Sequence, residues 1–439
     1  MKKRVLILSD RMNSRNMLIN LGDRALMSGL YNLIKKNLGY EIIPGSWKTY
    51  PYFTIKRFDK KHITTSDIEK IFNDMFIYAT KYSDKQVAFE KKVSNFLDKS
   101  IIFNNSIIKK INKKVQDKYT RGIIETLKPY ILRKYYTSNF ITKVKQADVV
   151  LFNGAGLIAD HLKYYLPAFL FEIYLAKKLG KKVIAVNQTV AVKEPLTFAL
   201  VSFVYKLVDA HILREPLSKE VLLRMGVKQE KIYVSPDSAF AIGKKVKGDI
   251  GKIMQKEGIK EGCIGLIIRG DRQINYNLWI RAICYIQQRY NKNVIFLYTC
   301  KSYDEHVFKI ISKKCGMRTL STYYDYPILI KIMSHLDFII TDRYHGAIFA
   351  ILANTPVIPV EATTFKLKGL FELFNYPIQI TDNANTLIKN IQVVVEKEKE
   401  LKILLSKVKM DLIKRVSEDT KIIEKVVANN EIFLQGQNK

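Results

Sequence analysis

DVVLFNGAGLIADHLKYYLPAFLFEIYLAKKLGKKVIAVNQTV, residues 148–190, contains the unit that decides the fold. An apolar run at 148–154 ends in a glycine-containing turn, an amphipathic stretch covers 164–179, and a second apolar run occupies 182–190. Continuous apolar strands separated by a helix are typical of parallel sheets whose two faces are both covered by helices. The segment therefore predicts a strand–helix–strand unit of an α/β fold.

The same alternation continues on both sides of this unit. Further short apolar runs, which we interpret as buried strands, lie at 4–9, 41–46, 210–215, 232–237, 262–270, 293–300, 317–322, 337–343 and 356–361. Amphipathic stretches separate them, including a helix expected from Asp23, one at 196–208 and one that Pro216 opens. Two successive sets of strands and helices predict two Rossmann-like, doubly wound domains that face a cleft.

We divide the chain accordingly. Residues 1–245 are assigned to an N-terminal domain, 246–385 to a C-terminal domain and 386–439 to a charged helical tail. Residues 50–145 break the rhythm of the first domain, and within 81–145 there are 16 Lys/Arg against 5 Asp/Glu, a local net of +11. We expect an insertion of basic amphipathic helices here, with apolar residues at helical spacing beside lysines: Ile101, Ile108, Ile111 and Val115 next to Lys109, Lys110, Lys113 and Lys114.

Two interpretations of this insertion stay open. Either its helices lie on an anionic membrane surface, or its apolar stripe packs on the first domain while the lysines face water.

The composition narrows the class of protein. The chain has 439 residues, 48% hydrophobic and 26% charged, which are globular proportions. Its 73 Lys+Arg against 41 Asp+Glu give a net charge of +32, but only 16 of the 73 are arginine. Because readers of nucleic-acid sequence rely on arginine for bidentate contacts, no specific nucleic-acid partner is expected. The charge predicts attraction to phosphorylated substrates or to an anionic membrane surface.

Neither a membrane-spanning helix nor a metal site is expected. The longest stretch free of charged side chains, Tyr344–Val360, contains a histidine and two prolines, so it is a poor candidate for crossing a bilayer. The four cysteines never occur in a C-x-x-C spacing, which predicts no disulfide framework, no zinc site and a reducing cytoplasm: Cys263, Cys284, Cys300 and Cys315.

Candidate ligand-binding residues follow the strands, because parallel sheets bind ligands beyond the carboxyl ends of their strands. In the turn at 153–156, Gly154 and Gly156 would let backbone approach an anion closely, although a plain tight turn needs no more. Asn20 and Asp23 follow the first strand in the segment NLGD, where a helix cap is the simpler interpretation of Asp23.

Three further candidates are cationic. Arg214 and Arg269 end two predicted strands, where an ion pair with a neighbouring carboxylate is the alternative interpretation. The most informative segment is TDRYHGAIFA at 341–350, in which a buried strand runs into Arg343 and His345 at the start of a small-residue helix. Spaced two apart, these side chains project in the same direction if the turn is extended. A guanidinium, an imidazole and helical N–H groups together suit a phosphate or a carboxylate.

Four blocks of the chain resemble the polysaccharide pyruvyl transferase family: NLGDRAL (20–26), NGAGLIAD (153–160), HILREPLSKEVLLRMG (211–226) with SPDSAF (235–240), and TDRYHGAIFA (341–350). The last is similar to the family's Ser-x-Arg-x-His-x-x-x-Phe-Ala signature, with Thr341 in the serine position. Arg24 stands where the family usually has an acidic residue, and Asn153 and Ala155 replace two glycines of its Gly-rich loop.

The resemblance implies a fold similar to GT-B glycosyltransferases. It also implies transfer of a pyruvyl group from phosphoenolpyruvate to a sugar of a cell-surface polysaccharide or its lipid-linked precursor, forming a cyclic ketal. Arg343 and Arg214 would bind the anionic groups, with Arg269 as a further substrate-binding candidate, and His345 would transfer a proton or donate to the phosphate. Asp23 and Asp160 would orient or deprotonate the acceptor. Such an enzyme would need no metal or cofactor beyond its co-substrate, and would work in the cytoplasm, with the inner membrane face as the place to meet a lipid-linked acceptor.

Two alternatives remain at this point. One is a GT-B glycosyltransferase with a nucleotide-sugar donor, in which Arg343 and His345 would contact a pyrophosphate and Glu361 or Glu372 would hold a ribose. The other is a non-catalytic basic protein that docks on membranes or nucleic acid, whose binding would collapse with salt.

Overall fold

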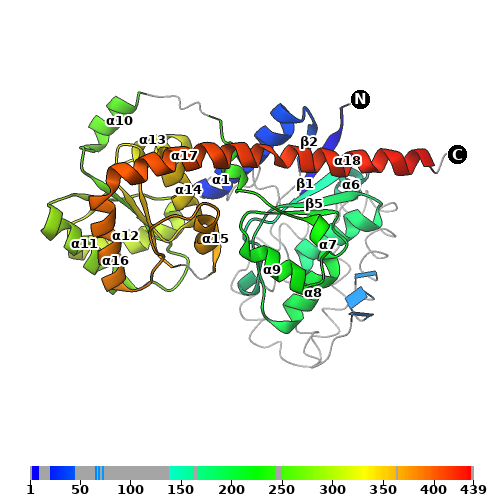
Figure 1. Cartoon of the computed structure of the whole chain (residues 1–439), viewed down its shortest axis with the longest axis horizontal. Helices are drawn as coiled ribbons and strands as arrows, with labels where there is room; N and C mark the ends of the chain where they lie inside the picture. The colour runs from blue at the N-terminus through cyan, green and yellow to red at the C-terminus, as the bar shows by residue number, and fades with distance from the viewer. Residues whose placement is uncertain are drawn as a thin grey trace, which may run out of the picture.

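Two parallel sheets organise the molecule (Figure 1). This computed structural model describes residues 2–8, 20–44, 65–66, 68–69, 72–73, 138–162, 166–243, 249–361 and 364–436. All strands of the first sheet precede residue 245, and all strands of the second follow it. The prediction of two Rossmann-like α/β domains is confirmed.

The first sheet has the strand order β2-β1-β3-β5-β7-β8, and every pair in it is parallel. Its strands are β1 (Arg4–Leu8), β2 (Glu41–Pro44), β3 (Val149–Asn153), β5 (Lys182–Gln188), β7 (Ala210–Leu213) and β8 (Ile232–Val234). Alternate residues of a strand point to opposite faces. Val5 and Ile7 accordingly pack in one core with α1 (Leu21–Asn32), while Leu6 and Leu8 pack in another with α7 (Leu166–Lys178) and α8 (Pro195–Tyr205).

The second sheet has the order β11-β10-β9-β12-β13 and is also parallel throughout. Its strands are β9 (Ile264–Ile267), β10 (Val294–Phe296), β11 (Arg318–Thr319), β12 (Ile339–Thr341) and β13 (Val357–Pro359). The helices of this half are α10 (Ile250–Glu257), α11 (Tyr276–Tyr290), α12 (Lys301–Cys315), α13 (Tyr326–Met333), α14 (Tyr344–Ala353), α15 (Lys366–Glu372) and α16 (Ala384–Glu396). Both sheets therefore direct the carboxyl ends of their strands towards loops that can line a common site.

Some boundaries differ from those expected. Helix α1 begins at Leu21 rather than at Asp23, because the Asn20 side chain caps it and accepts from the N–H groups of Gly22 and Asp23. Pro216 is the N-cap of α9 (Leu217–Arg224) and not its first residue. A small two-stranded sheet, β4 (Ile158–Ala159) with β6 (Val190–Ala191), was not predicted, because two-residue strands leave no periodicity in the sequence.

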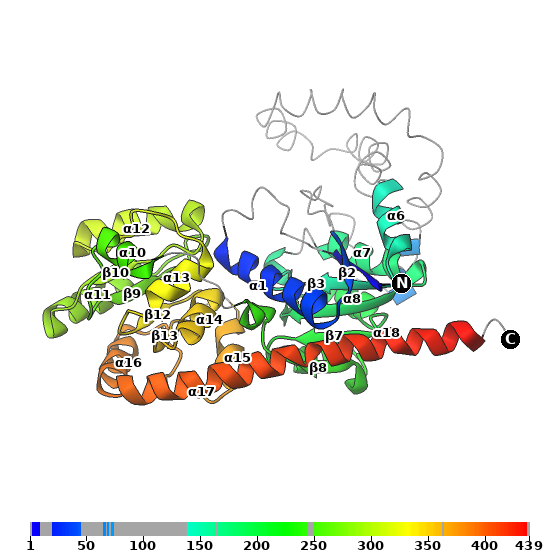
Figure 2. The ribbon, with the colours of Figure 1, turned by 90° about the horizontal axis from the view of Figure 1, so that it is seen from above.

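The C-terminal helices connect the two halves. Helix α17 (Glu398–Ser417) packs on α14 and on the 3-10 turn Ser238–Ala241, and α18 (Asp419–Gly436) continues onto β5 and β7 of the first sheet. Figure 2 shows the two helices running along one side of both domains. The buried residues of α17 recur every three or four positions, which gives it one continuous apolar face: Leu401, Leu405, Val408, Leu412 and Val416.

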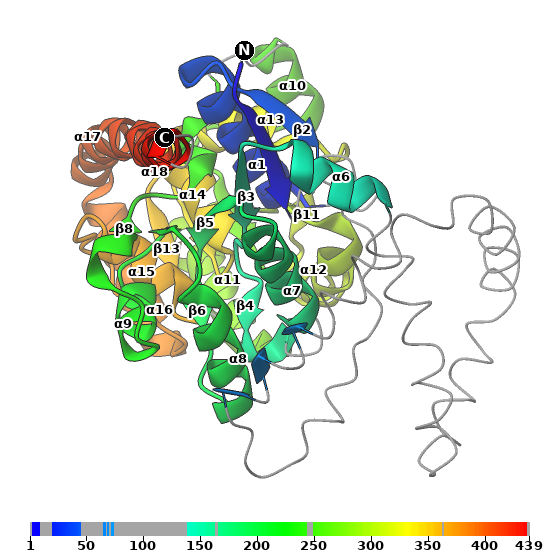
Figure 3. The ribbon, with the colours of Figure 1, turned by 90° about the vertical axis from the view of Figure 1, so that its right-hand side faces the viewer.

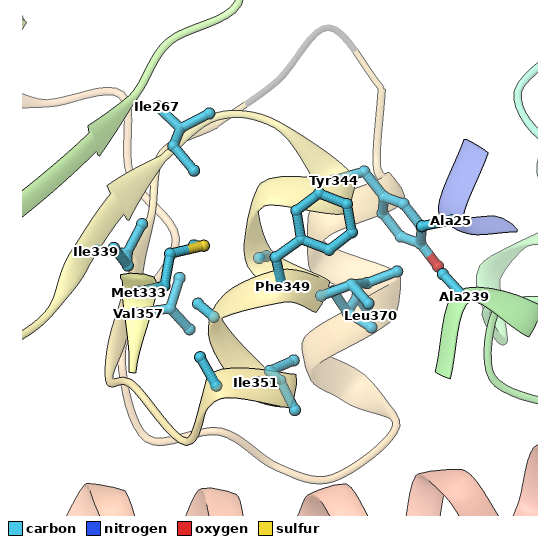
Figure 4. Close-up of a cluster of buried hydrophobic side chains, with 14 of the residues drawn as sticks. Ala25, Ala239, Ile267, Met333, Ile339, Tyr344, Phe349, Ile351, Val357 and Leu370 are labelled. Carbon is cyan, nitrogen blue, oxygen red and sulfur yellow. The ribbon is translucent and has the colours of Figure 1, made fainter. Parts of the chain in front are cut away.

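The domains also meet directly at the amino end of α1. The Leu21 N–H donates to the Thr299 carbonyl at 2.9 Å, and Arg24 pairs with Asp325 at 2.8 Å. Arg24, which stands where the family usually has an acidic residue, thus forms an ion pair between the two domains. In Figure 4 the Tyr344 side chain of α14 reaches past its own domain to Ala25 of α1 and Ala239 of the 3-10 turn. One apolar core therefore spans the interface.

Most of the predicted basic insertion lies outside the described residues, including its apolar stripe and the lysines beside it. Of residues 50–145, the described part is residues 65–66, 68–69 and 72–73 and most of α6 (Ser138–Gln146). Ile68 and Phe72 are buried with residues of α7 and α8 on one side of the first sheet. Figure 3 turns α7 and α8 towards the viewer. No helix in the described ranges is long and apolar enough to cross a membrane.

Candidate active site between the two domains

Arg214 is held rigidly just beyond the carboxyl end of β7. Its Nη1 donates to Asp237 Oδ2 at 2.8 Å and its Nε donates to Thr189 Oγ1 at 2.9 Å. The side chain is only 3% exposed, so the ion pair with Asp237 is desolvated. Asp237 is fixed in turn, because it caps the 3-10 turn by accepting from the Ala239 N–H at 2.9 Å. Arg214 is thus a buried, oriented cation.

His345 approaches the same carboxylate from the other domain. It is the second residue of α14, and its Nε2 lies 3.8 Å from Asp237 Oδ2. Burial by itself would raise the pKa of Asp237, but the interaction with His345 and the charge of Arg214 outweigh it and lower that pKa to about 2. Gly22 of α1 packs on the imidazole so closely that a Cβ there would collide with the ring. The structure therefore brings the predicted Arg214 and His345 together.

Arg343 has a different partner from His345, although the two were expected to project together. It is the N-cap of α14, and its guanidinium pairs with Asp304 of α12, whose side chain is fully buried. Asp304 also accepts from the N–H groups of Gly270 and Cys300, each at 3.1 Å. Burial raises the pKa of Asp304 despite the opposing charge of Arg343. Arg343 therefore connects the start of α14 to α12 within the C-terminal domain.

Arg269 lies at the carboxyl end of β9, on the C-terminal side of the site. Its Nη2 donates to Asp271 at 2.8 Å, and its backbone N–H donates to Asp342 Oδ1 at 2.8 Å. Asp342 also pairs with Arg272. The side chain of Arg269 remains 28% exposed, compared with 16% for Arg272. Arg269 is therefore more accessible to a ligand than Arg272.

The structure adds Lys366, which the sequence did not single out. It is the first residue of α15, after β13, and its ammonium lies over Gly156 beside Arg214. Burial, together with the charges of Arg214 and Arg269, lowers the pKa of Lys366 to about 7, although Asp23 and Asp271 partly oppose this shift. The position of Lys366 after a strand end could have identified it from the sequence, but one lysine among 57 does not stand out.

The two glycines of the turn at 153–156 serve different purposes. A Cβ on Gly156 would collide with the Lys366 ammonium and lie 3.6 Å from Arg214 Nη2, so this glycine keeps the space between the cations open. Gly154 instead packs on the Gln188 side chain. Between them, Ala155 adopts φ 43°, a left-handed conformation that favours glycine. Ala155, which stands where the family's loop has glycine, thus takes a backbone conformation usual for glycine.

The remaining predicted residues lie around this centre. Asn20 is the cap of α1, while Asp23, in the first turn of the helix, acts electrostatically on Lys366. Asp160 accepts from the N–H groups of Lys193 and Glu194 and from the Thr197 hydroxyl at the start of α8. Its carboxylate thereby holds the residues that lead into that helix, and neither Arg214 nor His345 contacts it through a hydrogen bond.

Chemically, this group of cations suits a small, doubly anionic ligand. Arg214 of the N-terminal domain and Lys366 of the C-terminal domain converge over Gly156, Arg269 acts on Lys366 from within the C-terminal domain, and His345 follows on α14. Such convergent cations neutralise a phosphate or carboxylate, and the imidazole can donate or move a proton. Within the described ranges, no group of three His, Cys, Asp or Glu side chains is placed to hold a metal ion.

Known proteins with a similar fold bind nucleotide sugars. The structure of UDP-GlcNAc 2-epimerase from Neisseria meningitidis bound to UDP-GlcNAc has a TM-score of 0.54 at 12% identity, covering 98% of this chain and 100% of that one. HepE from Anabaena in complex with UDP and glucose has a TM-score of 0.53 at 10% identity, with the same coverage. At such identities the likeness shows the shared two-domain, GT-B-like fold alone.

Sequence comparison identifies the family. The amylovoran biosynthesis protein AmsJ of Erwinia amylovora is 21% identical over 350 residues, which cover 74% of this chain and 82% of that protein. Residues 20–362 match the polysaccharide pyruvyl transferase family, and this range contains Arg214, Asp237, Arg343 and His345. This protein is therefore a transferase of polysaccharide modification and belongs to the polysaccharide pyruvyl transferase family.

Proposed function

We propose that the protein transfers a pyruvyl group from phosphoenolpyruvate to two hydroxyls of one sugar, in a polysaccharide or its lipid-linked precursor, and so forms a cyclic ketal. The observation that carries this proposal is the convergence of Arg214 and Lys366 over Gly156. His345 lies nearby, 3.8 Å from the Asp237 carboxylate that pairs with Arg214. Phosphoenolpyruvate carries a phosphate and a carboxylate on a three-carbon frame, so its site must place several cations within a few ångströms.

The residues suit each step of this reaction. A proton adds to the methylene carbon of the donor, the first sugar hydroxyl bonds to the adjacent carbon, phosphate leaves, and the second hydroxyl closes the ketal. The two hydroxyls release two protons, of which one replaces the proton given to carbon and the other leaves with the phosphate. We assign Arg214 and Lys366 to charge neutralisation and His345 to proton transfer.

The anion has two ends, and the cleft has two cationic sides. Arg214 and Lys366 form one side over Gly156, and we assign Arg269 and Arg343, which belong with Lys366 to the C-terminal domain, to the other. We therefore assign the carboxylate and the phosphate to opposite sides of the cleft. Arg343 contributes through the part of its guanidinium that Asp304 leaves free.

We place the acceptor sugar near the amino end of α1. Asp23 lies there in the first turn, close enough to Lys366 to raise its pKa. It is the carboxylate that we assign to orienting or deprotonating a hydroxyl. Asp160 is a weaker candidate than Asp23, since its oxygens already accept from the start of α8.

The decisive test is phosphate release from phosphoenolpyruvate across a panel of sugar acceptors, including a polyprenyl-linked one. We expect release that depends on the acceptor and a product heavier than the acceptor by the mass of a pyruvyl ketal. Acceptor-independent release, or none with any acceptor, would contradict the proposal.

A nucleotide-sugar donor is the second candidate, and the solved complexes of similar fold with UDP or UDP-GlcNAc favour it. Convergent arginine and lysine side chains suit a pyrophosphate as well as a phosphate. A ligand that binds the folded state raises the melting temperature by an amount that grows with the ratio of its concentration to its Kd. We expect phosphoenolpyruvate to stabilise the protein and UDP, UDP-glucose and UDP-GlcNAc to leave it unchanged. The reverse pattern would establish the glycosyltransferase function.

A further inference from the structure

Arg214 has three anchors, and one of them comes from the opposite domain. Thr189 and Asp237 hold it by hydrogen bonds within the N-terminal domain. The third is the aromatic ring of Tyr344, the first residue of α14, whose centroid lies 4.2 Å from Arg214 Cζ. At this distance the guanidinium lies against the ring and is attracted by its π electrons.

The ring contact fixes the tilt of the guanidinium plane, which the two hydrogen bonds leave undetermined. Bonds from Nε and Nη1 lie in the plane of the guanidinium and fix its position, but they allow the plane to tilt about the line that joins their acceptors. A ring packed on the flat side of the group opposes that tilt. The remaining nitrogen, Nη2, is thereby directed towards Gly156, where the Lys366 ammonium also lies.

The Tyr344 hydroxyl takes no part in the contact with Arg214. The side chain of Tyr344 is buried, and its hydroxyl makes no hydrogen bond to any described residue, although it points towards Ala239 (Figure 4). A buried hydroxyl without a partner costs free energy, so phenylalanine would serve the apolar core better. The feature of Tyr344 that the site uses is the face of its ring.

We propose that Tyr344 is a positioning residue, which orients Arg214 of the opposite domain towards the anion in the cleft. The proposal rests on the proposed function in so far as Arg214 binds the donor. It adds that this binding depends on the apposition of the two domains, because α14 supplies both Tyr344 and the adjacent His345. The residue between Arg343 and His345 thus determines how well the donor is held.

Three variants separate positioning from packing. Tyr344→Phe keeps the ring face and removes only the unpartnered hydroxyl, whereas Tyr344→Leu removes the face and keeps an apolar side chain. Phe338→Leu is the matched control, because Phe338 is also buried and immediately precedes β12, at the opposite end of that strand from Tyr344. Calorimetric titration with phosphoenolpyruvate and with inorganic phosphate gives the affinity, and steady-state kinetics give the KM of donor and acceptor separately.

We expect Tyr344→Leu to weaken binding of phosphoenolpyruvate by about tenfold or more, the range of a desolvated cation–π contact. Its acceptor KM should stay unchanged. Tyr344→Phe should restore wild-type affinity, and Phe338→Leu should lower the melting temperature without altering affinity. Wild-type donor affinity in a folded Tyr344→Leu protein, or equal losses in Tyr344→Phe and Tyr344→Leu, would overturn the proposal.

The two proposals fail in different ways. A wild-type protein that binds inorganic phosphate but not phosphoenolpyruvate would contradict the proposed donor, while the effect of Tyr344→Leu on phosphate affinity would still decide the role of Tyr344. A wild-type protein that binds neither anion would overturn both.

Discussion

Arg214 and His345, which belong to different domains, both lie beside the same carboxylate oxygen of Asp237. Arg214 Nη1 lies 2.8 Å and His345 Nε2 lies 3.8 Å from Asp237 Oδ2. The carboxylate is fully buried, and its pKa falls to about 2 because these two neighbours outweigh the effect of burial. Asp237 therefore remains ionised, and it lies between Arg214 and His345, the two groups that the proposed reaction requires.

Replacing Asp237 by asparagine should damage both stability and activity. The change keeps the shape but leaves the Arg214 charge buried without a partner, which typically costs about 3–5 kcal/mol of unfolding free energy. Urea denaturation measures this loss. Asp411→Asn is the control, since Asp411 is 58% exposed and pairs with Arg415 only at the surface, where about 0–1 kcal/mol is expected. A loss in Asp237→Asn no larger than in the control would contradict the buried pair.

The pH dependence of stability provides a second check on Asp237. Because its folded pKa is lowered to about 2, its ionised form stabilises the fold at pH values above its unfolded pKa, near 4. That contribution should disappear as the pH falls from about 4 to 2. We expect the wild type to lose more stability than Asp237→Asn over this interval, and parallel curves for the two proteins would show that the shift is absent.

Arg343 should be needed for folding as well as for the reaction. Its removal would leave the Asp304 carboxylate buried and unpaired, so Arg343→Ala should lose about 3–5 kcal/mol of stability. Combining Arg343→Ala with Asp304→Asn should recover part of that loss, because the stranded charge is then absent. Urea denaturation of the two single variants and the double variant measures the coupling. Strictly additive losses would show that the pair contributes nothing.

Lys366 should take up a proton when the donor binds. Its pKa of about 7 leaves the amine largely neutral at pH 8, and an incoming dianion favours the ammonium. Donor affinity should therefore increase as the pH falls from 8.5 to 7. Calorimetry at pH 8 in buffers of different ionisation enthalpy should detect uptake of a fraction of a proton in the wild type and none in Lys366→Arg, which stays charged. Equal uptake by both proteins would assign the proton to another group.

Sequence patterns predicted the fold and part of the site, for physical reasons. Buried parallel strands are continuous apolar runs, so the strands of both sheets were found from hydrophobicity, and the rule on strand ends selected Arg214 and His345. Asp237 and Lys366 were missed, since a carboxylate in a short turn and one lysine among many carry no periodic signal. Their roles depend on how the two domains meet. The ion pair of Arg343 with Asp304 likewise joins the start of α14 to α12, two elements distant in sequence.

The space over Gly156 offers the most selective test of the cleft. Gly156→Ala would place a methyl group against the Lys366 ammonium, the end of a flexible side chain that can move aside at little cost in stability. The protein should therefore melt normally, while donor affinity falls about tenfold, because the two cations no longer converge. Gly243→Ala is the matched control, since a Cβ there meets only Asn32 Nδ2 at 3.9 Å. Melting curves and the KM for phosphoenolpyruvate measure both effects. An unchanged KM for the donor in a folded Gly156→Ala protein would show that the donor binds elsewhere, because a methyl group inserted between Arg214 and Lys366 must obstruct an anion bound there.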